Sequence, residues 1–84
     1  MEIEIYTTPW CPFCIRAKDL LTSKGAKFTE YDVASDPDKR THMTSRASGG
    51  HTVPQIFIDD KHIGGCDDLY ALENKGSLDG MLGS

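Results

Sequence analysis

Residues 2–24 read EIEIYTTPWCPFCIRAKDLLTSK, and the succession of patterns in this stretch decides the fold. Glu and Ile alternate from residue 2, which is typical of a half-buried β-strand. Apolar residues then recur at helical spacing in residues 15–24. Because Cys11 and Cys14 lie between the two patterns, the stretch predicts two thiols at the start of a helix that directly follows a strand.

The next elements are predicted from the same kinds of pattern. A second strand is expected at residues 27–33, and a strand, a helix and a strand in this order form a unit whose two strands are parallel. Residues 35–38, Ser-Asp-Pro-Asp, are typical of a helix start. This helix is expected to run to Arg46 or Ala47, with Met43 and Ala47 facing inward.

A hairpin and a third helix complete the predicted fold. Residues 55–58 and 61–63 flank Asp59-Asp60, which predicts a tight turn between two strands. The third helix opens at Cys66 or Asp67. The element order is therefore β-α-β-α-β-β-α, which predicts an α/β fold with a four-stranded mixed sheet and helices on both faces.

Composition narrows the classes of function. The 84 residues fit one domain, residues 1–84, and a hydrophobic content of 38% is ordinary for a globular chain. Three cysteines are too few for a disulfide-stapled secreted scaffold, and no apolar run has the length of a membrane span. A net charge of −4 without a Lys/Arg cluster argues against nucleic acid and anionic membranes as partners. We expect a cytoplasmic protein.

The two thiols of the first motif have different expected roles. A thiolate, and not a thiol, is the nucleophile in disulfide exchange. A helix N-terminus presents unpaired N–H groups and a partial positive charge, which favour a thiolate at Cys11. We therefore predict that Cys11 attacks, that Cys14 resolves, and that the two can close a redox-active disulfide.

The alternative for these thiols is half of a zinc site. Cys66 and one of His42, His51 or His62 would complete it. Zinc sites usually pair two short motifs, whereas these ligands are scattered along the chain. We therefore favour the redox pair and expect no metal.

Two further motifs have candidate binding roles. Thr52-Val53-Pro54 precedes the third strand; it is either a plain strand entry or, with a cis bond, a segment whose Val53 N–H and C=O can pair with an extended peptide. In Gly64-Gly65-Cys66-Asp67-Asp68, Gly65 permits close approach of a ligand. The N–H groups of Cys66 and Asp67 can hold a carboxylate and the Asp67 side chain an ammonium group, unless an Asp here only caps the helix.

With CPFC at 11–14, TVP at 52–54 and GGCDD at 64–68, in this order and spacing, the chain resembles the dithiol glutaredoxins of the thioredoxin-like superfamily. The resemblance implies a glutathione-dependent oxidoreductase that reduces protein disulfides and glutathione mixed disulfides. It implies glutathione as co-substrate, no permanently bound cofactor, disulfide-containing or glutathionylated proteins as partners, and a monomer.

The resemblance also implies a glutathione site. Thr52 and Val53 would pair with the backbone of the glutathione cysteine, and Pro54 would be cis. Residues 65–67 would hold the γ-glutamyl end, and Phe13 would form a wall. The glutathione-binding residues implied in this way are Phe13, Arg40, Thr52, Val53, Pro54, Gly65, Cys66 and Asp67.

Two positions depart from the family pattern. Thr8 stands where many glutaredoxins carry a Lys, so we expect weaker activation of Cys11 and assign the glycine end of glutathione to Arg40. Trp10 precedes Cys11 as in thioredoxins, and we expect it to cap the core and not to contact a partner.

Two rival functions remain open from the sequence. One is a redoxin that is reduced by thioredoxin reductase, but such a protein has no need of the GGCDD segment. The other is a dimer that binds a [2Fe–2S] cluster through Cys11 and glutathione. Pro12 is expected to hinder cluster assembly.

Overall fold

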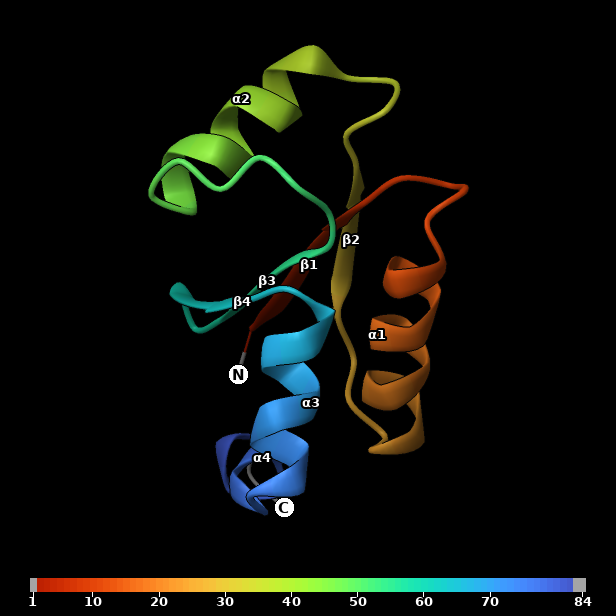
Figure 1. Cartoon of the computed structure of the whole chain (residues 1–84), viewed down its shortest axis with the longest axis vertical. Coiled ribbons are helices and arrows are strands. Elements are labelled where there is room, and N and C mark those ends of the chain that lie inside the picture. The colour runs from red at the N-terminus through yellow and green to blue at the C-terminus, as the bar shows by residue number, and fades with distance from the viewer. Residues whose placement is uncertain (1, 83–84) are drawn as a thin grey trace.

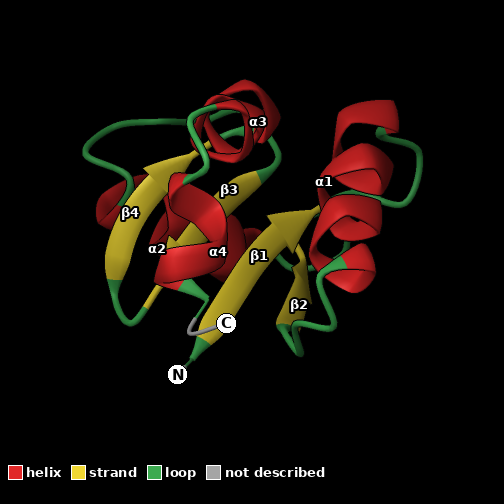
Figure 2. Ribbon diagram, turned by 90° about the horizontal axis from the view of Figure 1, so that it is seen from below, coloured by secondary structure: helices red, strands yellow, loops and turns green. Residues whose placement is uncertain are grey.

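The computed structural model describes residues 2–82, and in them the chain forms one mixed sheet with helices packed against it. Figure 2 shows the strand order β2-β1-β3-β4, in which β1 is parallel to β2, and β3 is antiparallel to both β1 and β4. The elements along the chain are β1 (Ile3–Thr7), α1 (Pro12–Ser23), β2 (Thr29–Asp32), α2 (Pro37–Arg46), β3 (Gln55–Ile58), β4 (Lys61–Gly64), α3 (Cys66–Asn74) and α4 (Ser77–Met81). The predicted fold class is confirmed.

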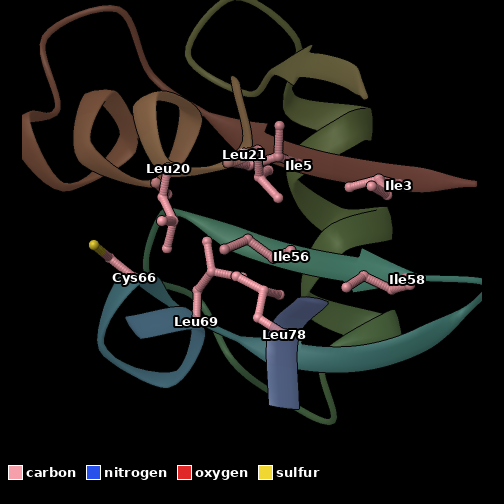
Figure 3. Close-up of a cluster of buried hydrophobic side chains, with 10 residues drawn as sticks. Ile3, Ile5, Leu20, Leu21, Ile56, Ile58, Cys66, Leu69 and Leu78 are labelled. Carbon is pink, nitrogen blue, oxygen red and sulfur yellow. The ribbon is translucent and has the colours of Figure 1, made fainter. Parts of the chain in front are cut away.

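The two faces of the sheet carry separate apolar clusters, because side chains alternate along each strand. Ile5 and Ile56 point to the face that α1, α3 and α4 cover, where they meet Leu21 and Leu69 (Figure 3). The next residues along these strands, Tyr6 and Phe57, point to the other face, where Met43 and Ala47 of α2 cover them. Figure 1 shows α2 on the opposite side of the strands from α1 and α3, so helices cover both faces as predicted.

Strand direction brings the three sequence motifs to one edge of the sheet. The end of β1 lies beside the start of β3, because Tyr6 pairs with Gln55 in antiparallel register. The end of β4 lies there too, because Gly64 pairs with Ile56. The Cys11 motif follows β1, residues 52–54 precede β3, and residues 64–68 follow β4. The fold therefore gathers these segments although they are far apart in the sequence.

The position of Trp10 contradicts the sequence-based expectation. Its side chain is 74% exposed, so it does not cap the core. Cys14 and Ala17, both fully buried, fill the space beneath the start of α1. The segment between β1 and α1 carries Trp10 outside this packed layer.

No helix within residues 2–82 combines the length and the apolar character that a membrane span requires.

Candidate functional site

The two thiols lie at the first turn of α1. Cys11 is the residue before the helix and has an extended backbone, with φ −97° and ψ 110°. Its Sγ accepts a hydrogen bond from the backbone N–H of Cys14 at 3.1 Å. A sulfur atom thus takes the place that Ser or Asp usually occupies when a side chain caps a helix. This hydrogen bond and the partial positive charge of the helix end favour negative charge on the Cys11 sulfur.

Burial separates the two thiols. Cys14 is fully buried, whereas 9% of the Cys11 surface is exposed. Burial, the hydrogen bond with Cys11 and the negative charge there together raise the pKa of Cys14 to about 12, although the Thr8 backbone acts in the opposite direction. Cys14 is therefore a neutral thiol at neutral pH, and Cys11 is the thiol that a substrate can reach.

The Thr52-Val53-Pro54 segment borders Cys11 directly. The Val53–Pro54 peptide bond is cis, as the family resemblance implies. The Val53 carbonyl accepts a hydrogen bond from the Cys11 thiol at 3.8 Å. Within residues 2–82 the Val53 N–H has no hydrogen-bond partner, and is therefore available to a ligand.

Gln55 and Arg40 hold the Thr52-Val53-Pro54 segment in place, a role that the sequence did not predict for either residue. Gln55, 6% exposed, donates from Nε2 to the Thr52 carbonyl at 3.1 Å. Its Oε1 lies 2.6 Å from Nε2 of His62 on the neighbouring strand β4. From the other side, Arg40 Nη2 donates to the His51 carbonyl at 3.2 Å. The one feature of the sequence that could have indicated this role is that Gln55 is a polar residue at the start of an otherwise apolar strand.

The third motif forms the start of α3, and Asp68 is its capping group. Asp68 Oδ2 accepts a hydrogen bond from the Gly65 N–H at 3.0 Å. This leaves the exposed Asp67 carboxylate for another role. Gly64, and not Gly65, is the position that requires glycine: its φ is +121°, and a Cβ there would lie 2.9 Å from the Asp68 Cβ.

One cavity joins the three motifs, with a volume of about 500 Å³. Most of the predicted glutathione-binding residues lie in its walls, and Cys11 borders it through the contact with Val53. Arg40 is not among the lining residues, and its contact with glutathione stays a prediction. The lining residues are Phe13, Thr52, Val53, Pro54, Gln55, His62, Gly64, Gly65, Cys66, Asp67 and Asp68.

Cys66 lies in the cavity wall and is 4% exposed. In Figure 3 its sulfur points away from the Ile and Leu side chains of the cluster. Burial raises its pKa, although the positive charge of Arg16 acts in the opposite direction. A raised pKa favours the neutral thiol at Cys66, and its role in binding glutathione stays a prediction.

The described part of the chain contains no group of three or more His, Cys, Asp and Glu side chains that could hold a metal ion. The zinc alternative would need Cys66 and a histidine beside the redox pair. Of the candidate histidines, His62 stacks on Phe57 and contacts Gln55. The geometry thus gives no support to a zinc site.

Comparison with known proteins identifies relatives over almost the whole length. A family model described as Glutaredoxin matches residues 3–63. Over 81 residues, the chain is 58% identical to Glutaredoxin 3 of Escherichia coli strain K12, covering 96% of each protein. A glutaredoxin from Brucella melitensis, solved in solution, is 55% identical with a TM-score of 0.85, and the match covers 98% of this chain and 88% of that one. A buckwheat glutaredoxin solved in complex with glutathione is 30% identical with a TM-score of 0.86, over 95% and 74% of the two chains.

Proposed function

This chain belongs to the glutaredoxin family, and on that premise we propose that it reduces protein disulfides and glutathione mixed disulfides with glutathione as the electron donor. Family membership supports the broader class, a thiol–disulfide oxidoreductase. The observation that carries the dependence on glutathione is the cavity beside Cys11, which gathers the TVP and GGCDD segments. A structural neighbour of the same fold has been solved with glutathione bound.

The cavity offers complementary groups for the two ends of a short peptide. The free N–H of Val53 and its carbonyl can pair with the backbone of the glutathione cysteine, which brings its sulfur toward Cys11. At the start of α3, the N–H groups of Cys66 and Asp67 can bind a carboxylate, and the Asp67 carboxylate can bind an ammonium group. The γ-glutamyl end of glutathione carries both groups. Phe13 also lines the cavity.

In the first chemical step the Cys11 thiolate attacks a mixed disulfide at its glutathione sulfur. The disulfide bond breaks, the protein thiolate leaves and takes up a proton, and a bond forms between Cys11 and glutathione. The thiolate of a second glutathione then attacks the glutathione sulfur on Cys11. Oxidised glutathione leaves and Cys11 is a thiolate again, so the mixed disulfide and one glutathione molecule yield the protein thiol and oxidised glutathione.

With a protein disulfide, Cys14 resolves the intermediate. Cys11 forms a mixed disulfide with one protein sulfur and the other leaves as a thiol. Two of the causes that raise the pKa of Cys14, the hydrogen bond with Cys11 and the charge there, disappear once Cys11 is covalently bound. Cys14 then ionises more readily and attacks the Cys11 sulfur, which releases the second protein thiol and forms a Cys11–Cys14 disulfide. Two glutathione molecules reduce this disulfide and leave as oxidised glutathione. Cys14 therefore becomes reactive only after Cys11 has formed its mixed disulfide with the substrate.

The test compares two electron supplies for the same disulfide. We expect NADPH oxidation in the presence of glutathione and glutathione reductase, and none above background with thioredoxin reductase in their place. Cys11→Ser should abolish the activity, and Cys14→Ser should keep activity on a glutathione mixed disulfide but lose it on a protein disulfide. Activity with thioredoxin reductase alone would contradict the proposal.

Asp67→Asn tests the glutathione cavity within the same assay. Removing the carboxylate should raise the KM for glutathione by roughly tenfold, because a charge-assisted hydrogen bond is lost. Asp19→Asn is the matched control, since Asp19 lies exposed on α1 and outside the lining of the cavity. Equal KM values for the two variants would remove Asp67 from the glutathione site.

A further inference from the structure

Trp10 is a large apolar side chain with no structural role in the described chain. It is 74% exposed, the highest fraction among the exposed large hydrophobic residues. Within residues 2–82 its indole has no hydrogen-bond, aromatic or cation partner. Side chains of this kind are enriched in the centres of protein interfaces, where they gain the most from losing contact with water.

Trp10 is next to the reacting thiol in the chain but lies outside the lining of the cavity. It directly precedes Cys11, but it is not among the residues that line the cavity. Phe13 lines the cavity and is also 53% exposed to solvent. Two exposed apolar side chains, Trp10 and Phe13, therefore belong to the segment that carries the redox pair.

The recessed position of Cys11 indicates which kind of molecule contacts these exposed side chains. With 9% of its surface exposed, Cys11 can meet a disulfide only if the substrate comes close to the residues around it. Glutathione is small enough to be held in the cavity alone. A protein substrate brings chain on either side of its reacting cysteine, and this chain has to lie on the surface around Cys11, which includes Trp10.

We propose that Trp10 is a docking contact for protein substrates, and that it favours a segment with an apolar side chain beside its reacting cysteine. The proposal rests on the disulfide reductase activity proposed above. It assigns specificity for the protein partner to Trp10 and leaves glutathione recognition to the cavity. No bond changes at Trp10, since the indole contributes only apolar contact.

The test uses three disulfide substrates with wild type and Trp10→Ser. Two are synthetic peptides of equal length, each in mixed disulfide with glutathione, with Leu or with Ser flanking the cysteine. The third is the mixed disulfide of glutathione with 2-mercaptoethanol. We expect Trp10→Ser to lower kcat/KM by roughly tenfold for the Leu peptide, and by less than about twofold for the other two. Trp10→Phe should restore most of the loss.

Ile15→Ser is the matched control, because Ile15 is 49% exposed and lies on the solvent-facing side of α1. It should leave the ratio between the two peptides unchanged. An equal effect of Trp10→Ser on all three substrates, or none on any, would overturn the proposal. So would concentration-dependent self-association of the wild type that Trp10→Ser abolishes, because a second copy would then be the occupant. Failure of wild type to reduce the small mixed disulfide with glutathione would instead refute the proposed function itself.

Discussion

Cys11 and Cys14 differ in chemistry although they are only three positions apart, because one precedes α1 and the other lies inside its first turn. Cys11 stands outside the helix, where its sulfur receives the Cys14 N–H, while Cys14 is turned into the core. The start of α1 thus stabilises negative charge on the Cys11 sulfur, whereas the Cys14 sulfur is shielded from water in the core. This difference is a property of single residues, and it can be measured on single thiols.

The raised pKa of Cys14 predicts slow alkylation. In a Cys11→Ser, Cys66→Ser variant, Cys14 is the remaining thiol, and burial still raises its pKa even though the contribution of Cys11 is gone. A raised pKa keeps the neutral thiol dominant at neutral pH, so iodoacetamide should modify Cys14 far more slowly than a free cysteine. Mass spectrometry of timed samples measures the rate, which should rise as the pH increases toward the raised pKa.

A Cys14→Ser, Cys66→Ser variant is the control, because Cys11 is then the thiol that reacts. Modification of Cys14 at the rate of a free cysteine whose pKa is about 8.5 would show that the buried position is not maintained in solution.

At the scale of elements, the start of α3 depends on the turn that precedes it. β4 ends at Gly64, whose φ of +121° turns the chain into the helix. The next residue, Gly65, donates to Asp68, and this hydrogen bond closes the first turn of α3. The N–H groups that face the cavity are oriented by these two features together.

Gly64→Ala should therefore damage both the fold and the cavity. A Cβ at this position meets the Asp68 side chain, and the backbone conformation is unfavourable for any residue other than glycine. We expect a loss of about 1–3 kcal/mol in the free energy of unfolding and a raised KM for glutathione. Urea denaturation and the coupled assay measure the two effects.

Gly80→Ala is the matched control, because Gly80 lies in α4, and a Cβ there would have no atom within 4 Å. It should leave the KM unchanged and stabilise slightly, since alanine has the higher helix propensity. Equal stability of the two variants would contradict the account of the turn.

At the scale of the whole molecule, one ion pair ties α2 to the sheet. Arg46 donates to both Glu4 oxygens, at 3.0 Å and 3.2 Å, and to the Tyr6 hydroxyl at 2.9 Å. Its guanidinium lies 4.0 Å from the centroid of the Phe57 ring. The hydrogen bonds between Arg46 and Glu4 connect residues that are 42 positions apart in the chain.

Glu4→Gln should destabilise the protein in a pH-dependent way. The hydrogen bonds from Arg46 hold the pKa of Glu4 below its usual value. A lowered pKa contributes stability that is present above the unfolded-state value of about 4.3 and is lost as the pH falls through the folded-state value. We expect a loss of about 1–3 kcal/mol at neutral pH, because the Glu4 side chain is only 13% exposed. Urea denaturation across the acid range should show this difference shrinking as the pH falls.

Glu2→Gln changes the same chemical group at an exposed position and should have little effect at any pH. A difference between Glu4→Gln and wild type that stays constant from neutral to acid pH would show that the carboxylate charge does not contribute.

Local patterns predicted the elements well because each depends on neighbours within a few residues. Asp36 lies directly before α2, where the Ser-Asp-Pro-Asp pattern predicts a helix start. Asp59 and Asp60 form the predicted hairpin turn, both with positive φ. Met43 is buried as predicted, because α2 has few other apolar residues to turn toward the sheet.

Contacts between segments could not be predicted in this way. Trp10 could equally have been buried or exposed, since its exposure depends on how the segment after β1 leaves the sheet. The contact between Gln55 and His62 depends on the register of β3 with β4. The choice of Asp68 over Asp67 as the capping group depends on whether α3 begins at Cys66 or Asp67, and it begins at Cys66.

The sequence by itself determined the order of elements, the family and the two candidate thiols, because periodicity, helix-start residues and short motifs are local properties of the chain. Only the tertiary structure decided which residues share one cavity, that Arg40 contacts the His51 carbonyl, and that Trp10 is exposed beside Cys11. These properties depend on strand direction and on packing between distant segments. Their energies arise from desolvation and contact in three dimensions, which no local pattern records.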